Sequence, residues 1–151
     1  MSQIRWEWFR FEELSVNDLY DLLRLRSAVF VVEQECVFLD MDNFDQDSWH
    51  CLGRVGNDLA LYLRCIPPEV FGSGYSSLGR IICDPNFRLS GRGKMLVEKG
   101  IEFANRQWPE AQIKIGAQER LLRFYENLGF ESVSEPYDED GIQHIDMIYQ
   151  K

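Results

Sequence analysis

The sequence lacks long apolar runs, and none is longer than AVFVV, residues 28–32. A membrane-spanning helix needs about 20 consecutive apolar residues, so we expect no membrane partner. The opening stretch, MSQIRWEWFRFEEL, carries charges at Arg5, Glu7 and Arg10 and has no continuous apolar core of the kind found in signal peptides. We therefore expect a cytoplasmic protein.

Positive charge is also scarce: 16 Lys and Arg stand against 25 Asp and Glu, which gives a formal net charge of −9. Proteins that bind nucleic acids present a basic face to the phosphates, so we expect no nucleic-acid partner. The same balance disfavours an anionic membrane surface. Long-range attraction favours a cationic partner, and an amine is the simplest one.

The 4 cysteines, Cys36, Cys51, Cys65 and Cys83, are far apart and form no CxxC pair. Zinc is therefore disfavoured, and we expect buried free thiols in a reducing compartment. The acidic segment DMDNFDQDSWH, residues 40–50, resembles a calcium-binding loop. Phenylalanine stands at its fifth ligand position, however, and aspartate stands where glycine must turn the chain. We expect a solvated loop and no metal.

No repeat, low-complexity tract or linker divides the chain, so we expect a single domain over residues 1–151. Ser15 is a candidate N-cap for a helix through residue 34, and further helices are expected over residues 91–107 and 119–129. Strands are expected over IRWEWFRF, CLGRV, LALYLRCI, SLGRIIC, QIKIGA, FESVSE and HIDMIYQ. This interleaving indicates an α/β (α+β) fold, a mixed and mostly antiparallel sheet of roughly six to seven strands flanked by about four helices.

The segment RLSGRGKML, residues 88–96, places 3 cations and 2 glycines between an expected strand and an expected helix. Glycines let backbone N–H groups approach an anion at a helix N-terminus. A nucleoside triphosphatase loop is excluded because Met95 stands where Ser or Thr is needed. The dinucleotide fingerprint is excluded because Leu96 replaces its third glycine. The pattern that remains is RxxGxG.

RxxGxG, followed by FYENLGF at residues 124–130, resembles the GNAT superfamily of N-acetyltransferases that depend on acetyl-coenzyme A (acetyl-CoA). Within it, VFVVEQEC (29–36), GRIICD (79–84) and EDGIQHIDM (139–147) resemble the small ElaA-like proteins. The resemblance implies a single GNAT domain. It also implies an acyltransferase that moves an acetyl group to a primary amine, of a small molecule or peptide, by direct attack in a ternary complex.

The same resemblance implies which residues hold the coenzyme. They are Ile81, Ile82, Cys83, Arg88, Leu89, Ser90, Gly91, Arg92, Gly93, Lys94, Gln118 and Tyr125. A backbone N–H near Ile82 or Cys83 would polarise the thioester carbonyl. Tyr125 would protonate the departing thiolate.

The group that removes the proton of the amine stays open. Glu33 is the first candidate, because it ends an apolar helical segment and could have a raised pKa. His50 and His144, the 2 histidines, can titrate near neutral pH and, with Glu33, are candidates for contact with the substrate. The acidic candidates for recognising a cationic acceptor are Asp42, Asp45, Glu139 and Asp140.

Two other functions stay open. One is a CoA-binding module or regulatory protein with little catalysis, which would need the phosphate loop but not the thiolate acid Tyr125. The other is a thiol hydrolase that uses Cys83, which would need a base beside the thiol. An exposed edge strand would allow a homodimer.

Overall fold

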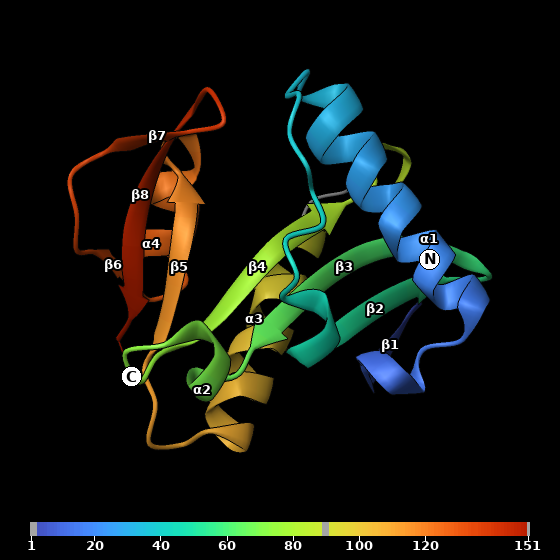
Figure 1. Cartoon of the computed structure of the whole chain (residues 1–151), viewed down its shortest axis with the longest axis horizontal. Helices are drawn as coiled ribbons and strands as arrows, with labels where there is room; N and C mark the ends of the chain where they lie inside the picture. Colours follow the sequence, from blue (N-terminus) through green and yellow to red (C-terminus); the bar gives the residue numbers. More distant parts are fainter. Residues whose placement is uncertain (1–2, 89–90, 151) are drawn as a thin grey trace.

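Figure 1 shows the computed structural model of the chain, which describes residues 3–88 and 91–150. Its strands are β1 (Ile4–Arg10), β2 (Trp49–Val55), β3 (Asp58–Ile66), β4 (Ser76–Cys83), β5 (Ile113–Gln118), β6 (Phe130–Ser132), β7 (Tyr137–Glu139) and β8 (Ile142–Tyr149). They form an 8-stranded sheet in the order β1-β2-β3-β4-β5-β8-β6, with β7 paired to β8. The expected fold class is confirmed, and the short β7 is the strand that sequence alone did not predict.

Four α-helices accompany the sheet in the described part of the chain: α1 (Val16–Arg26), α2 (Pro68–Phe71), α3 (Arg92–Gln107) and α4 (Leu122–Glu126). The helix expected from Ser15 begins there, because the Ser15 hydroxyl accepts a hydrogen bond from the N–H of Asp18 at 3.0 Å. After α1 the chain continues as a π-helical segment, Ser27–Glu33.

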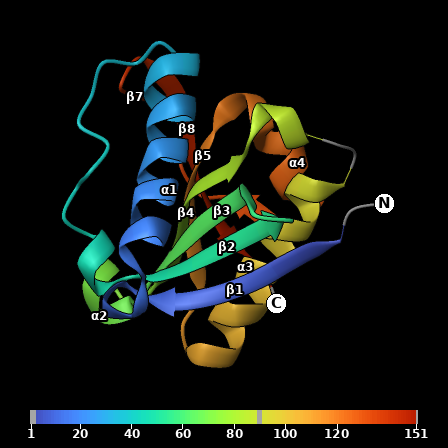
Figure 2. The same ribbon diagram turned by 90° about the vertical axis from the view of Figure 1, so that its right-hand side faces the viewer.

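The two long helices cover opposite faces of the sheet (Figure 2). Alternate residues of a strand point to opposite faces, and in β3 Leu61 and Leu63 pack in the core that contains α3, whereas Tyr62 packs in the core that contains α1. α3 approaches β3 closely, because a Cβ at Gly100 would lie 2.9 Å from the side chain of Leu63. Both faces of the central strands are therefore buried.

The sheet opens between β4 and β5, its parallel pair. Within the described residues these strands pair at Ser76 with Ile113 and at Ser77 with Lys114, and at no position beyond. Figure 1 shows the two strands diverging from that point. The backbone groups of β4 that face β5 are consequently left without a strand partner over the second half of β4.

β4 also carries a bulge on the side that faces β3. Arg64 of β3 pairs with Gly79, and Tyr62 pairs with Ile82, so two residues of β4 lie opposite one residue of β3. Arg80, one of the two, has φ of 51°, a conformation that costs a non-glycine residue about 1 kcal/mol or more. Neighbouring groups must hold it there.

Two further findings bear on the expectations. Among the residues described, no helix is long and apolar enough to cross a membrane. Cys36, Cys51 and Cys65 are buried free thiols, as predicted, and Cys83 is half-buried.

Candidate functional site

A cleft of about 650 Å³ lies where β4 and β5 diverge. Its walls come from these two strands, the β7–β8 hairpin and the segment of residues 30–44. Of the expected site residues, Ile81, Gln118, Tyr125 and His144 line the cleft. Three of the acidic candidates, Asp42, Glu139 and Asp140, also line it, whereas Glu33, Asp45 and the other expected residues that the structure describes lie outside its lining.

The free backbone edge of β4 ends at Cys83. The N–H of Asp84 donates to Ala60 O at 2.8 Å, so Asp84 and, two residues earlier, Ile82 form the hydrogen-bonded pairs with β3. The N–H and C=O of Cys83 therefore point away from β3, toward the side that β5 has left. Arg88 uses this edge, because its Nε donates to Cys83 O at 2.8 Å.

Of the two backbone donors expected near the thioester, Cys83 thus has its N–H on the free edge and Ile82 does not. The side chain of Ile82 is buried in the α1 core. The Cys83 thiol is 3.5 Å from Phe87 O, and partial burial raises its pKa. A raised pKa disfavours the thiolate that a nucleophilic cysteine needs.

Tyr125 of α4 is 5% exposed and stacks edge-to-face on Phe124 and Phe130. Burial raises the pKa of its phenol to about 12. Among the residues described, none hydrogen-bonds the hydroxyl group. This phenol therefore keeps its proton at neutral pH and is free to donate it into the cleft.

The N-terminus of α3 has the form expected of an anion site. Gly91 is its N-cap with φ of 87°, and no side chain of the residues that the structure describes makes a capping hydrogen bond to the helix. The first turn contains no acidic residue, and the first backbone bond is from Met95 N to Gly91 O at 3.0 Å. A Cβ at Gly91 would meet no heavy atom within 4 Å in the part of the chain described. Leu89 and Ser90 lie outside the described residues.

This helix terminus lies close to α4, the helix that carries Tyr125. A Cβ at Gly93 would lie 3.7 Å from the ring of Phe124, the neighbour of Tyr125. Arg92 is held across the preceding turn, with Nη1 donating to Phe87 O at 3.0 Å. The uncapped N–H groups, Arg92 and Lys94 together fit a diphosphate.

Glu33 does not meet its expectation. Its carboxylate accepts two hydrogen bonds from Arg88, at 2.8 and 2.9 Å. The hydrogen bond from Arg88 lowers the pKa of Glu33 and outweighs desolvation. The prediction of a raised pKa was therefore wrong, because the apolar residues before Glu33 said nothing about the arginine that folds against it from 55 positions away.

His50 is a structural residue and not a substrate contact. It is 0% exposed and lies outside the cleft. Its Nδ1 lies 2.6 Å from the Tyr62 hydroxyl, and its Nε2 lies 2.9 Å from Asp45 O. Burial lowers its pKa, which disfavours the expected titration near neutral pH.

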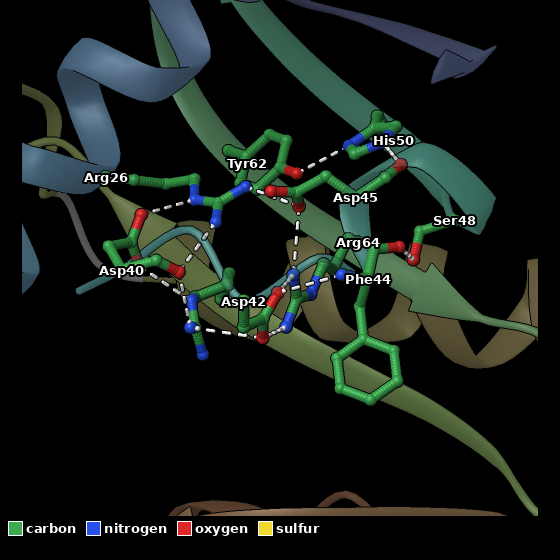
Figure 3. Close-up of polar contacts among 10 residues, drawn as sticks. Arg26, Asp40, Asp42, Phe44, Asp45, Ser48, His50, Tyr62 and Arg64 are labelled. Carbon is green, nitrogen blue, oxygen red and sulfur yellow. Dashed lines mark hydrogen bonds and ion pairs between the residues drawn. The ribbon is translucent and has the colours of Figure 1, made fainter. Parts of the chain in front are cut away.

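The acidic loop is only partly solvated, because Asp40, Asp42 and Asp45 are ion-paired with arginines. Figure 3 shows its carboxylates interleaved with Arg26 of α1 and Arg64 of β3. Arg26, which is 0% exposed, donates to Asp40 at 2.8 Å and to Asp45 at 2.7 Å. Arg64 donates to Asp45 at 2.9 Å and to both carboxylate oxygens of Asp42. We refer to Arg26, Arg64, Arg80, Asp40, Asp42 and Asp45 as the Arg–Asp network.

Arg80 connects this network to the bulge of β4. Its Nε donates to a carboxylate oxygen of Asp40 at 2.7 Å, and its Nη2 donates to Asp40 O at 2.7 Å. These bonds hold the residue with positive φ in place. The guanidinium groups lower the pKa of Asp42 to about 2 and also lower that of Asp45. Asp42 and Asp45 are thus neutralised by arginine, which removes them as recognition groups for a cationic acceptor.

Sequence reasoning missed this network. The available signal was an arginine within each of three apolar segments, LLRLR, LALYLRCI and LGRIIC, since buried arginine needs an acidic partner. At the other wall of the cleft, Gln118 Nε2 donates to Gln34 Oε1 at 3.4 Å. His144, on β8, lies opposite Gln118 in the sheet.

Comparison with known proteins identifies relatives. A family model for the acetyltransferase (GNAT) domain matches residues 70–151. Protein ElaA from Escherichia coli is 40% identical over 146 residues, which cover 95% of this chain and 95% of that protein. The crystal structure of E. coli ElaA aligns with a TM-score of 0.92 at 38% identity, over 98% of this chain and 100% of that one.

Two other solved structures are similar. An acyl-CoA N-acyltransferase from Pseudomonas aeruginosa aligns with a TM-score of 0.91 at 34% identity, over 97% of this chain and 99% of that one. A GNAT family acetyltransferase from Elizabethkingia anophelis, solved with acetyl-CoA bound, aligns with a TM-score of 0.61 at 18% identity, over 96% of this chain and 94% of that one. The second likeness concerns the fold alone.

Proposed function

Since this chain belongs to the GNAT acetyltransferase family, and within it to the ElaA-like proteins, we propose that it transfers the acetyl group of acetyl-CoA to a primary amine. The observation that carries the proposal is a cleft lined by the free edge of β4 and by Tyr125, with the N-terminus of α3 packed against Phe124, the neighbour of Tyr125. The acceptor is an amine of a small molecule or peptide, which suits an acidic protein.

The chain's own groups are suited to hold the coenzyme. The N–H groups of the first turn of α3 would bind the diphosphate, and Arg92 and Lys94 would supply positive potential. The pantetheine arm would lie along the free edge of β4, between Ile81 and Cys83, with the amide of Gln118 on the opposite wall. Arg88 would contribute once its bonds to Glu33 are exchanged for the phosphates.

The reaction would use two groups of the cleft. As the amine attacks, negative charge develops on the thioester oxygen, and the N–H of Cys83 would stabilise it; one such donor is typically worth about 100-fold or more. When the C–S bond breaks, the electron pair leaves on sulfur, and Tyr125 would give its proton to the thiolate. The raised pKa of Tyr125, about 12, favours this role because it keeps the proton available.

A screen of primary amines for release of free CoA from acetyl-CoA tests the proposal. We expect at least one amine to give release that grows with enzyme concentration, together with the acetylated amine by mass spectrometry. Tight binding of acetyl-CoA without release with any amine would favour the CoA-binding module. Release without an acetylated amine, abolished by alkylation of Cys83, would favour the thiol hydrolase.

A further inference from the structure

Transfer to an amine, the function proposed above, needs a group that takes a proton, because a primary amine is mostly an ammonium ion at neutral pH and has no free electron pair. That group must present an unprotonated atom to the cleft. General bases of this kind typically contribute about 100-fold to 10,000-fold to the rate.

Several ionisable groups of the cleft are already engaged. Asp42 is ion-paired with Arg64 and Arg80. Asp146 accepts a hydrogen bond from the Tyr137 hydroxyl at 2.6 Å and lies 3.9 Å from Lys114 Nζ. These carboxylates would lose a strong partner if they took a proton.

The ring of His144 is differently placed. Its Nδ1 lies 2.8 Å from Ile142 O, and because a carbonyl oxygen only accepts, Nδ1 carries the proton in the neutral ring. Nε2 is therefore the atom with the free electron pair. The side chain lines the cleft and is 10% exposed.

Glu139 lies beside this nitrogen and also lines the cleft. Its carboxylate lies 3.5 Å from His144 Nε2 and is 57% exposed at the side chain. Tyr137 also stacks on the ring at a centroid distance of 6.1 Å, and Gln118 on β5 is the cross-strand partner of His144, with its Oε1 accepting from Arg120 at 3.0 Å. Glu139 is thus the group that stabilises a positive charge on the ring.

We propose that Nε2 of His144 takes the proton of the acceptor's ammonium group, and that Glu139 is a positioning residue that stabilises the resulting imidazolium.

The proton and electron balance is as follows. The ammonium gives one proton to Nε2, which later passes it to solvent, and the freed electron pair forms the C–N bond. The C–S bond breaks with its electron pair on sulfur, and the thiolate takes a proton from Tyr125. A second proton leaves the attacking nitrogen and restores Tyr125 by way of water. The products are the amide, free CoA thiol and one proton.

Kinetics of His144→Asn test the assignment, because the asparagine amide can still donate to Ile142 O while it cannot act as a base. With the best amine of the screen, we expect kcat to fall about 100-fold or more at pH 7 and affinity for acetyl-CoA to stay within about 2-fold. Added imidazole should restore part of the rate. Glu139→Gln should shift the acidic limb of the pH–rate profile to lower pH. Asp138→Asn, which removes a charge from the same hairpin, should leave the profile unchanged.

A less basic, fluorinated analogue of the same amine sharpens the test. This analogue is already uncharged near pH 7, so the fall in kcat caused by His144→Asn should be at least about 10-fold smaller with it. An equal loss with both amines, or a change in KM alone, would overturn the assignment and leave His144 as a binding or structural residue.

Nitrogen-15 NMR of the 2 histidines gives a readout that needs no acceptor. We expect His144 as the Nδ1–H tautomer, and His50 as an internal control whose signals the substitution Glu139→Gln does not move. An Nε2–H tautomer would overturn the proposal even if the enzyme is active. If no amine is acetylated while these signals behave as expected, the proposed function fails.

Discussion

At the scale of single residues, burial acts on two kinds of ionisable side chain with opposite results. Tyr125 is buried without a charged partner, and its pKa rises to about 12, so it keeps its proton. Asp45 is buried between Arg26 and Arg64, and its pKa falls although desolvation opposes the fall. The neutral phenol lies in the cleft and suits chemistry, whereas the charged aspartate belongs to a structural network.

Tyr125→Phe keeps the ring contacts with Phe124 and Phe130 and removes the hydroxyl group that would protonate the thiolate. We expect kcat to fall about 100-fold and the dissociation constant of acetyl-CoA to change less than about 3-fold. Steady-state kinetics and calorimetry measure the two quantities. An unaltered kcat would remove Tyr125 from the mechanism.

Asp45→Asn should destabilise the protein by about 3 kcal/mol, because it takes the charged partner from a fully buried Arg26 and from Arg64. Asp47→Asn is the matched control, since Asp47 is exposed in the same 3-10 turn. Urea denaturation of both variants measures the difference. Equal stability of the two would mean that the network contributes nothing to folding.

At the scale of elements, the site depends on where three backbone segments end or bend. β4 leaves β5 after Ser77, which frees the edge that ends at Cys83. The bulge at Arg80 is anchored to Asp40 by two hydrogen bonds of 2.7 Å. α3 begins at Gly91 without a capping side chain. Each feature leaves backbone polar groups available to a ligand instead of to the protein.

Lys94→Glu tests the N-terminus of α3, because it places a carboxylate in the first turn, where it competes with a diphosphate for the N–H groups. We expect the dissociation constant of acetyl-CoA to rise about 10-fold or more. Lys99→Glu makes the same change of charge on the same helix, more than one turn further from Gly91. It should change the dissociation constant of acetyl-CoA by less than about 2-fold. If both variants weaken binding equally, net charge and not the helix terminus governs affinity.

The elements that local sequence specifies were predictable, and those that depend on distant residues were not. The glycines at 91 and 93 and the cations around them are adjacent in sequence, so the loop and α3 could be predicted. The Arg–Asp network joins residues 26 to 80, and nothing local pairs Arg26 with Asp45. The prediction of a raised pKa for Glu33 failed for the same reason, because the distant Arg88 lowers that pKa. β7 has the sequence YDE, so two of its three residues are acidic and no apolar alternation indicates a strand.

At the scale of the whole molecule, the net charge of −9 conceals a local division of charge. The Arg–Asp network balances three arginines against three aspartates. The cations Arg88, Arg92 and Lys94 gather at the start of α3. A protein that repels anions at long range can therefore still attract a diphosphate at one short-range site.

Acid should unfold the protein by protonating the network. A carboxylate with a lowered folded pKa contributes stability that is complete above its unfolded pKa, about 4, and is lost as the pH falls through the folded value. The folded pKa of Asp42 is about 2. We therefore expect the free energy of unfolding to decline between about pH 4 and pH 2. In Asp42→Asn, the free energy of unfolding should decline less steeply over the same range. Parallel curves for the two proteins would show that Asp42 does not contribute.

The central claim is that acetyl-CoA binds in the cleft between β4 and β5 with its diphosphate at the N-terminus of α3. A crystal structure with acetyl-CoA bound tests this most directly. The account predicts diphosphate oxygens within hydrogen-bond distance of the N–H groups of residues 92–94, and the thioester carbonyl within reach of the N–H of Cys83. Acetyl-CoA bound elsewhere, or a diphosphate held by side chains away from α3, would contradict it.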